Sequence, residues 1–150
     1  MSDLRDLYQE MILDHCKRPR NFHKLEEAST CAEGHNPLCG DRFTVYLNIK
    51  DGVVEDASFQ GGGCAISTAS ASMMTESLKG KTITEVQDLF QKFHKLLTSE
   101  SDSQEGAPDL GKLLVFSGVR EFPVRVKCAT LAWHTLRAAL EEGLKTVTTE

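Results

Sequence analysis

The sequence Asn36-Pro37-Leu38-Cys39-Gly40-Asp41 lies inside a region of extended pattern that runs from about Ala28 to Gln60. It places a thiol and a carboxylate two residues apart, with a proline before the thiol and a glycine between the two. Two further cysteines, Cys64 and Cys128, are far away in the sequence. Our hypothesis is that the fold gathers Cys39, Asp41, Cys64 and Cys128 around one metal ion.

The residues that follow this stretch predict a β-hairpin. Apolar and polar residues alternate from Phe43 to Lys50, which is the period of a half-buried strand. Asp51-Gly52 is a strong turn signal, and residues 53–59 return as the partner strand. The segment around Ala28 to Ala32 is predicted as a third strand.

Helices are predicted on both sides of this region. An amphipathic helix precedes Pro19, and a helix rich in small residues runs from Cys64 to about Lys79. A capping-box pattern at Thr82 begins a third helix. The segment 113–116 is predicted as a helical turn, and a last helix is predicted to begin at Cys128. The polar segment from Thr98 to Pro108 is predicted to be a surface loop.

Length and composition limit the possible classes of protein. The 150 residues fit a single domain, 1–150. A net charge of -5, from 22 acidic and 17 basic residues, argues against a nucleic-acid binder. No apolar run is long enough for a membrane span, and residues 1–10 are too polar for a signal peptide. We therefore expect a cytoplasmic protein.

The five cysteines cannot all form internal disulfides, and none of them forms a paired C-x2-C zinc motif. Spacing alone is thus a weak signal for metal. The predicted helix starts at Cys64 and Cys128 favour thiolates, because a helix N-terminus lowers a thiol pKa. The alternative is that both are small buried apolar residues. We interpret Cys16 and Cys31 as core or surface residues without a role in the site.

Five motifs occur in order and together resemble one family. They are Asp14-His15…Pro19-Arg20-Asn21, Asn36-Pro37-Leu38-Cys39-Gly40-Asp41, Val54-Glu55-Asp56-Ala57-Ser58-Phe59, Gly63-Cys64-Ala65-Ile66-Ser67 and Val126-Lys127-Cys128-Ala129-Thr130-Leu131. They look like the iron–sulfur cluster assembly scaffolds of the IscU and NifU N-terminal family. The resemblance covers nearly the whole chain. It implies an α+β fold with a small three-stranded antiparallel sheet and about five helices.

Two departures from the IscU-like scaffolds are similar to the SufU branch, the zinc-dependent sulfurtransferases. The residue before the third motif cysteine is Lys127 rather than histidine, and 63 residues separate Cys64 from Cys128. The resemblance implies Zn²⁺ held by Cys39, Asp41, Cys64 and Cys128. Arg125 and Lys127 are expected near the metal.

The same resemblance implies a function and partners. Cys39 is our choice of sulfur acceptor, with Cys128 as the runner-up. The sulfur would come from the persulfide of a SufS-like, pyridoxal-phosphate-dependent cysteine desulfurase and pass to the Suf cluster-assembly machinery. The main alternative is a scaffold on which a [2Fe–2S] cluster is assembled. A structural zinc module that acts as a binding adaptor is the third possibility.

Overall fold

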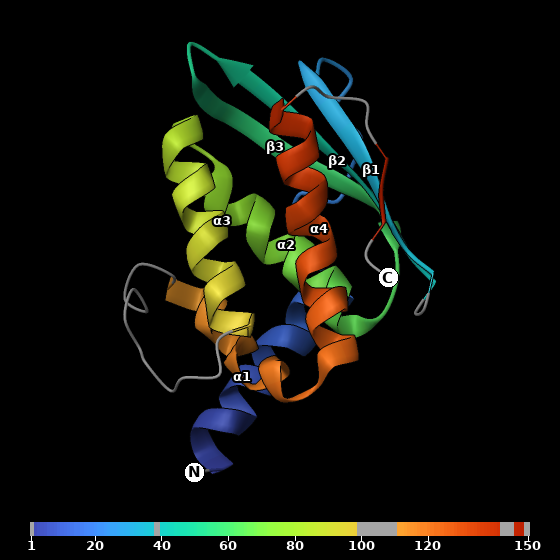
Figure 1. Ribbon diagram of the computed structural model, residues 1–150, viewed down its shortest axis with the longest axis vertical. Coiled ribbons are helices and arrows are strands. Elements are labelled where there is room, and N and C mark those ends of the chain that lie inside the picture. Colours follow the sequence, from blue (N-terminus) through green and yellow to red (C-terminus); the bar gives the residue numbers. More distant parts are fainter. Residues whose placement is uncertain (1, 38–39, 99–110, 142–145, 149–150) are drawn as a thin grey trace.

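The computed structural model describes residues 2–37, 40–98, 111–141 and 146–148 (Figure 1). Helices and strands follow one another along the chain in the order α1 (Ser2–Lys17), β1 (Thr30–Asn36), β2 (Asp41–Lys50), β3 (Val53–Gly62), α2 (Ala65–Leu78), α3 (Ile83–Thr98), η2 (Gly111–Glu121), α4 (Pro123–Glu141) and β4 (Thr146–Thr148). The predicted α+β class is therefore confirmed. The predicted loop from Thr98 to Pro108 lies almost entirely outside the described residues.

The sheet has the strand order β3-β2-β1-β4. Strands β1, β2 and β3 are antiparallel, as predicted, and the third strand runs from Thr30 rather than Ala28. The turn at Asp51 and Gly52 has positive φ at both residues, 54° and 76°, which is typical of a tight hairpin. Strand β4 was not predicted. It pairs in parallel with β1, opposite residues 33–35.

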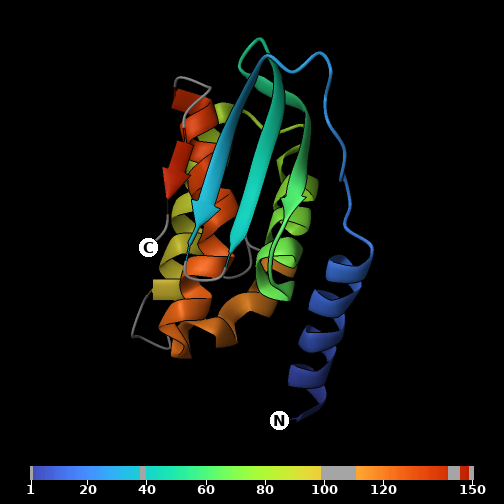
Figure 2. The same cartoon turned by 90° about the vertical axis from the view of Figure 1, so that its right-hand side faces the viewer.

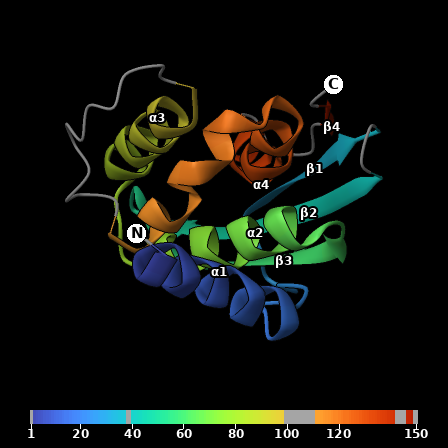
Figure 3. The ribbon, with the colours of Figure 1, turned by 90° about the horizontal axis from the view of Figure 1, so that it is seen from below.

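The helices cover one face of the sheet. Figure 3 shows α2 and α4 stacked on this face, and Figure 2 shows the strands in front of the helices. Alternate β2 residues, Phe43, Val45 and Leu47, are fully buried on the covered face. The core continues between the helices, where the ring of Trp133 stacks on that of Phe93 at 4.6 Å. The apolar residues of the alternating pattern in β2 therefore lie on the face of the sheet that the helices cover.

The prediction of about five helices is wrong, because the described residues contain four α-helices. The segment around residues 113–116 is part of η2, an eleven-residue 3₁₀ helix. The predicted start of the last helix at Cys128 is also wrong, because α4 begins at Pro123. Proline is favoured at the first position of a helix, where its missing N–H removes no hydrogen bond. No helix within the described ranges has the length and apolar character needed to span a membrane.

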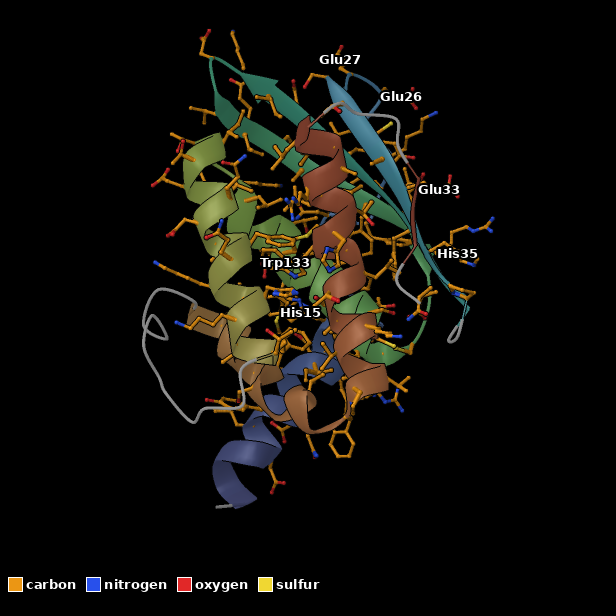
Figure 4. All side chains as sticks on the ribbon, viewed as in Figure 1. His15, Glu26, Glu27, Glu33, His35 and Trp133 are labelled. Carbon is orange, nitrogen blue, oxygen red and sulfur yellow. The ribbon has the colours of Figure 1, made fainter. Side chains whose placement is uncertain are left out.

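Helix α1 lies along α2, on the side away from α4 (Figure 3). His15 is buried, and its Nδ1 is 2.7 Å from the hydroxyl of Ser72 on α2. The backbone N–H of Arg20 donates to the same hydroxyl at 2.8 Å. Figure 4 shows His15 among the helices, well away from the labelled residues of β1. A polar cluster therefore joins α1 and the following turn to α2.

Candidate metal centre

The two ends of the central motif lie opposite each other at the end of the β1–β2 hairpin. Asn36 is the last residue of β1, Asp41 is the first residue of β2, and the two are paired in register. Both side chains are fully buried. Pro37 and Gly40 between them are exposed, and Gly40 has φ of 73°. Cys39, the predicted fourth ligand and sulfur acceptor, lies outside the described residues.

The carboxylate of Asp41 lies against the start of α2. The backbone N–H of Cys64 donates to Oδ1 of Asp41 at 2.8 Å, and Oδ2 is 4.0 Å from the sulfur of Cys64. This approach requires a glycine at position 63. A Cβ there would overlap Asp41 Oδ1 and would lie 2.7 Å from the hydroxyl of Ser67.

Cys64 is the N-cap residue of α2, as its predicted place at the helix start requires. Its extended backbone, with ψ of 170°, turns the thiol back over the first turn of the helix. The backbone N–H of Ser67 donates to the sulfur at 3.4 Å, and the Ser67 hydroxyl is 3.5 Å from it. The N-cap position therefore directs the sulfur of Cys64 toward the first backbone N–H groups of α2.

Cys128 reaches the site from a different kind of position. It lies in the second turn of α4, five residues after Pro123, and is fully buried. The argument that a helix N-terminus favours its thiolate therefore does not hold. Its sulfur instead lies 3.9 Å from the side-chain nitrogen of Asn36, which donates toward it.

The fold brings three of the four predicted ligands together. One ligand atom each from Asp41, Cys64 and Cys128 lies within 4.8 Å of the others. Tetrahedral zinc with Zn–S bonds of about 2.3 Å places its sulfur ligands roughly 3.8 Å apart, so the spacing fits. The donor set fits as well, because two thiolates and a carboxylate are ligands that zinc accepts. Asp41 and Cys128 are buried and Cys64 is half-buried, and a carboxylate and two thiols placed side by side with so little water favour a cation among them.

Two other cysteines and two basic residues also had predicted places relative to the metal ligands. Cys16 in α1 and Cys31 in β1 are half-buried and lie outside this cluster, as predicted. Lys127 directly precedes Cys128 in α4 and is half-buried, and Arg125 is exposed.

Asn36, Gly63 and Ser67 belong to the site, although sequence reasoning gave none of them a role. Ser67 follows Cys64 by three residues, which is the spacing at which an N-cap side chain meets a backbone N–H. That spacing was a usable signal for Ser67. The contact between Asn36 and Cys128 spans 92 residues of sequence, and no local pattern predicts it.

Comparison with known sequences gives the family and its named members. Residues 7–129 match the NifU-like N-terminal domain. A Bacillus subtilis protein named zinc-dependent sulfurtransferase SufU is 41% identical over 144 residues, which are 95% of this chain and 96% of that protein. A Thermotoga maritima protein named iron–sulfur cluster assembly scaffold protein IscU is 41% identical over 136 residues, 91% of this chain and 94% of that protein.

Comparison with solved structures agrees. A crystal structure from Fervidobacterium islandicum, described as a candidate iron–sulfur cluster assembly scaffold protein for the SUF system, superposes with a TM-score of 0.81. It is 35% identical, over 88% of this chain and 95% of that one. The domain match, the sequence identities and the shared fold lead to the same conclusion. The chain belongs to the family of NifU-like N-terminal domains.

Proposed function

We propose that this protein is a zinc-dependent sulfurtransferase that receives sulfur from a cysteine desulfurase for iron–sulfur cluster assembly. The observation that carries the proposal is the meeting of Asp41, Cys64 and Cys128 in one cluster, in which Asp41 and Cys128 are buried and Cys64 is half-buried. The similarity to the B. subtilis protein named zinc-dependent sulfurtransferase supports the choice of zinc. Cys39, three residues after Asn36, would complete a four-ligand set.

Bound zinc would keep the thiols deprotonated at neutral pH, since ligation favours thiolate. The protein supplies the positions. Asp41 is fixed by the N–H of Cys64, and Cys64 is held at the first turn of α2. Cys128 is held in the interior by α4. Cys39 is our acceptor, because its described neighbours Pro37 and Gly40 are exposed, whereas Cys128 is buried.

The transfer step resembles thiol–disulfide exchange. The thiolate of Cys39 attacks the outer sulfur of the desulfurase persulfide and forms a new S–S bond. The old S–S bond breaks, and the desulfurase cysteine leaves as a thiolate. Cys39 then carries the persulfide to the next component of the Suf machinery. The reaction needs reduced thiols, so we place it in the cytoplasm.

A second candidate function is a scaffold that assembles a [2Fe–2S] cluster on the same side chains. The equal identity to the T. maritima protein named as a scaffold favours it. Lys127 argues against it. IscU-like scaffolds carry a histidine next to the last cysteine, and a protonated lysine cannot replace that histidine as an iron ligand because its ammonium group has no free electron pair. Reconstitution with iron and sulfide separates the two functions: a stable, stoichiometric cluster absorption would support the scaffold.

Metal analysis of the purified protein is the direct test. We expect about one zinc per chain, as four-ligand coordination predicts, and its loss or easy removal in Asp41→Ala. Asp56→Ala is the matched control, because Asp56 is a β3 carboxylate that pairs with Lys79. A protein without zinc, or an Asp41→Ala variant with wild-type zinc, would contradict the proposal. If Cys39→Ala leaves sulfide release by the desulfurase unchanged, the structural zinc module becomes the better explanation.

A further inference from the structure

Ser67 faces the sulfur of Cys64 with two donors. Its backbone N–H donates to Sγ at 3.4 Å, and its hydroxyl oxygen lies 3.5 Å from Sγ and 3.1 Å from the Cys64 carbonyl oxygen. The side chain is buried, with a relative exposure of 1%. The hydroxyl proton therefore has two acceptors within the protein. A thiolate sulfur attracts this proton more strongly than a neutral thiol does, because ionised acceptors make stronger hydrogen bonds.

Other serines of α2 use their hydroxyls differently. Ser70 donates to the carbonyl of Ala129, and Ser77 donates to the carbonyl of Met73. Both acceptors are backbone carbonyl oxygens rather than cysteine sulfurs. Ser67 differs from these two serines because a proposed ligand, the sulfur of Cys64, lies 3.5 Å from its hydroxyl in addition to a carbonyl acceptor.

Asn36 has the corresponding position beside Cys128. Its side chain is fully buried, and its Nδ2 is 3.9 Å from the Cys128 sulfur. Because Asn36 is paired with Asp41 in the hairpin, the same pair of residues presents a hydrogen-bond donor and a carboxylate to the cluster. The sulfurs of Cys64 and Cys128 therefore each have a buried side chain that can donate to them.

We propose that Ser67 and Asn36 are positioning residues that keep Cys64 and Cys128 as ligands and leave the sulfur-accepting role to Cys39. This inference rests on the proposed function. A hydrogen bond to a thiolate withdraws charge from the sulfur, and thiolates of lower basicity are weaker nucleophiles. Partners of this kind fix the orientation of metal ligands and tune their properties. The two donors thus select which of three cysteines reacts.

The first experiment replaces zinc with Co²⁺ and records the sulfur-to-cobalt charge-transfer band. Ser67→Ala removes the hydroxyl, makes the sulfur more electron-rich and should move the band to longer wavelength. The affinity for Co²⁺ should fall by about 10-fold, as for other outer partners of metal ligands. Ser67→Thr keeps a hydroxyl and should restore the wild-type band. Ser77→Ala, a matched serine on the same helix, should leave band and affinity unchanged.

The second experiment maps the transferred sulfur. The zinc protein is treated with glutathione persulfide, alkylated, digested and analysed by mass spectrometry of the cysteine peptides. Wild type should carry sulfur on Cys39, Ser67→Ala should also carry it on Cys64, and Asn36→Ala should also carry it on Cys128. Asn36→Ser, which is smaller but polar, serves if the alanine variant does not fold. Asn48→Ala, on β2 and outside the cluster, is the control.

The outcomes separate this inference from the proposed function. A variant with the wild-type band and wild-type sulfur distribution, but a lower melting temperature, would overturn the positioning role, because its side chain would then only support the fold. This outcome would overturn the positioning role even if the transferred sulfur were found on Cys39. Wild-type protein without sulfur on Cys39 would instead overturn the proposed sulfur transfer, whatever the position of the cobalt band.

Discussion

Gly63 shows how strictly single residues control the candidate metal centre. It lies between the Asp41 carboxylate and the Ser67 hydroxyl, and a Cβ at this position would meet both. Its neighbour Gly62 has no atom within 4 Å of such a Cβ. Of these two adjacent glycines, only Gly63 is required by the packing of the site.

We expect Gly63→Ala to weaken metal binding by about 10-fold or more, because the new methyl group displaces the Asp41 carboxylate from the start of α2. Gly62→Ala should bind metal like wild type. Competition with a chromophoric zinc chelator measures both affinities. Equal affinities for the two variants would show that the carboxylate moves without loss, and that Asp41 is not held for metal binding.

At the scale of elements, the motif from Asp14 to Asn21 has a structural role that the sequence left open. Arg20 pairs with Asp14 at 2.6 Å, and the backbone N–H of Arg20 donates to Ser72. Asn21 donates to the hydroxyl of Thr75 at 3.1 Å. Much of this motif is therefore used to attach α1 and its turn to α2.

His15 makes this attachment sensitive to pH. Burial lowers the pKa of His15 below its ordinary value of 6.5, and Arg20 lowers it further, while Glu76 raises it. Lys112 also faces it and lowers its pKa, and Asp14 raises it. The unfolded chain binds the His15 proton more readily than the folded chain does. The stabilising contribution of neutral His15 is therefore complete above about pH 6.5 and is lost as the pH falls below that value.

We expect the free energy of unfolding to decrease below pH 6.5, with a contribution from His15 of at most about 1.4 kcal/mol per pH unit. His15→Gln should be less stable at pH 7.5 by about 1 kcal/mol, because the hydrogen bond to Ser72 is weakened. The variant should also lose the His15 contribution to the pH dependence of the free energy of unfolding. Urea unfolding of the metal-free proteins from pH 5 to 8 measures this. His23→Gln, at an exposed position, should keep the wild-type slope. Parallel curves for His15→Gln and wild type would contradict the expectation.

At the scale of the whole molecule, the candidate centre joins three parts of the fold. Asp41 comes from the end of the β1–β2 hairpin, Cys64 from the start of α2, and Cys128 from α4. A bound ion would therefore cross-link the sheet to two helices that pack on it. Binding to the folded state alone stabilises that state by mass action.

Removal of metal should accordingly lower the melting temperature. With free zinc at about 100 times its dissociation constant, we expect a difference of roughly 5 to 10 °C between loaded and chelator-treated protein. Calorimetry of both forms measures this difference. In Asp41→Ala the difference should largely disappear. A chelator that leaves the wild-type melting temperature unchanged would show that the three segments are held without the ion.

Much of the fold and part of the site were predictable from local sequence. Helical periodicity predicted α1, and the capping-box pattern at Thr82 predicted α3. Alternation with Asp51-Gly52 predicted the β2–β3 hairpin. The run of small residues after Cys64 predicted α2. These signals work because each depends on residues that are neighbours in the chain. The ordered motifs then supplied the family, which local patterns could not.

Local sequence was enough to specify the hairpin, the start of the helix at Cys64 and the thiol and carboxylate groups that the site uses. The folded chain showed in addition that α4 begins at Pro123, so that Cys128 approaches from a buried second turn rather than from a helix N-terminus. It also decided that Asn36 lies beside Cys128, and that β4 pairs with β1. The physical reason is that these contacts depend on strand register and helix packing between segments far apart in the chain, which no local pattern specifies.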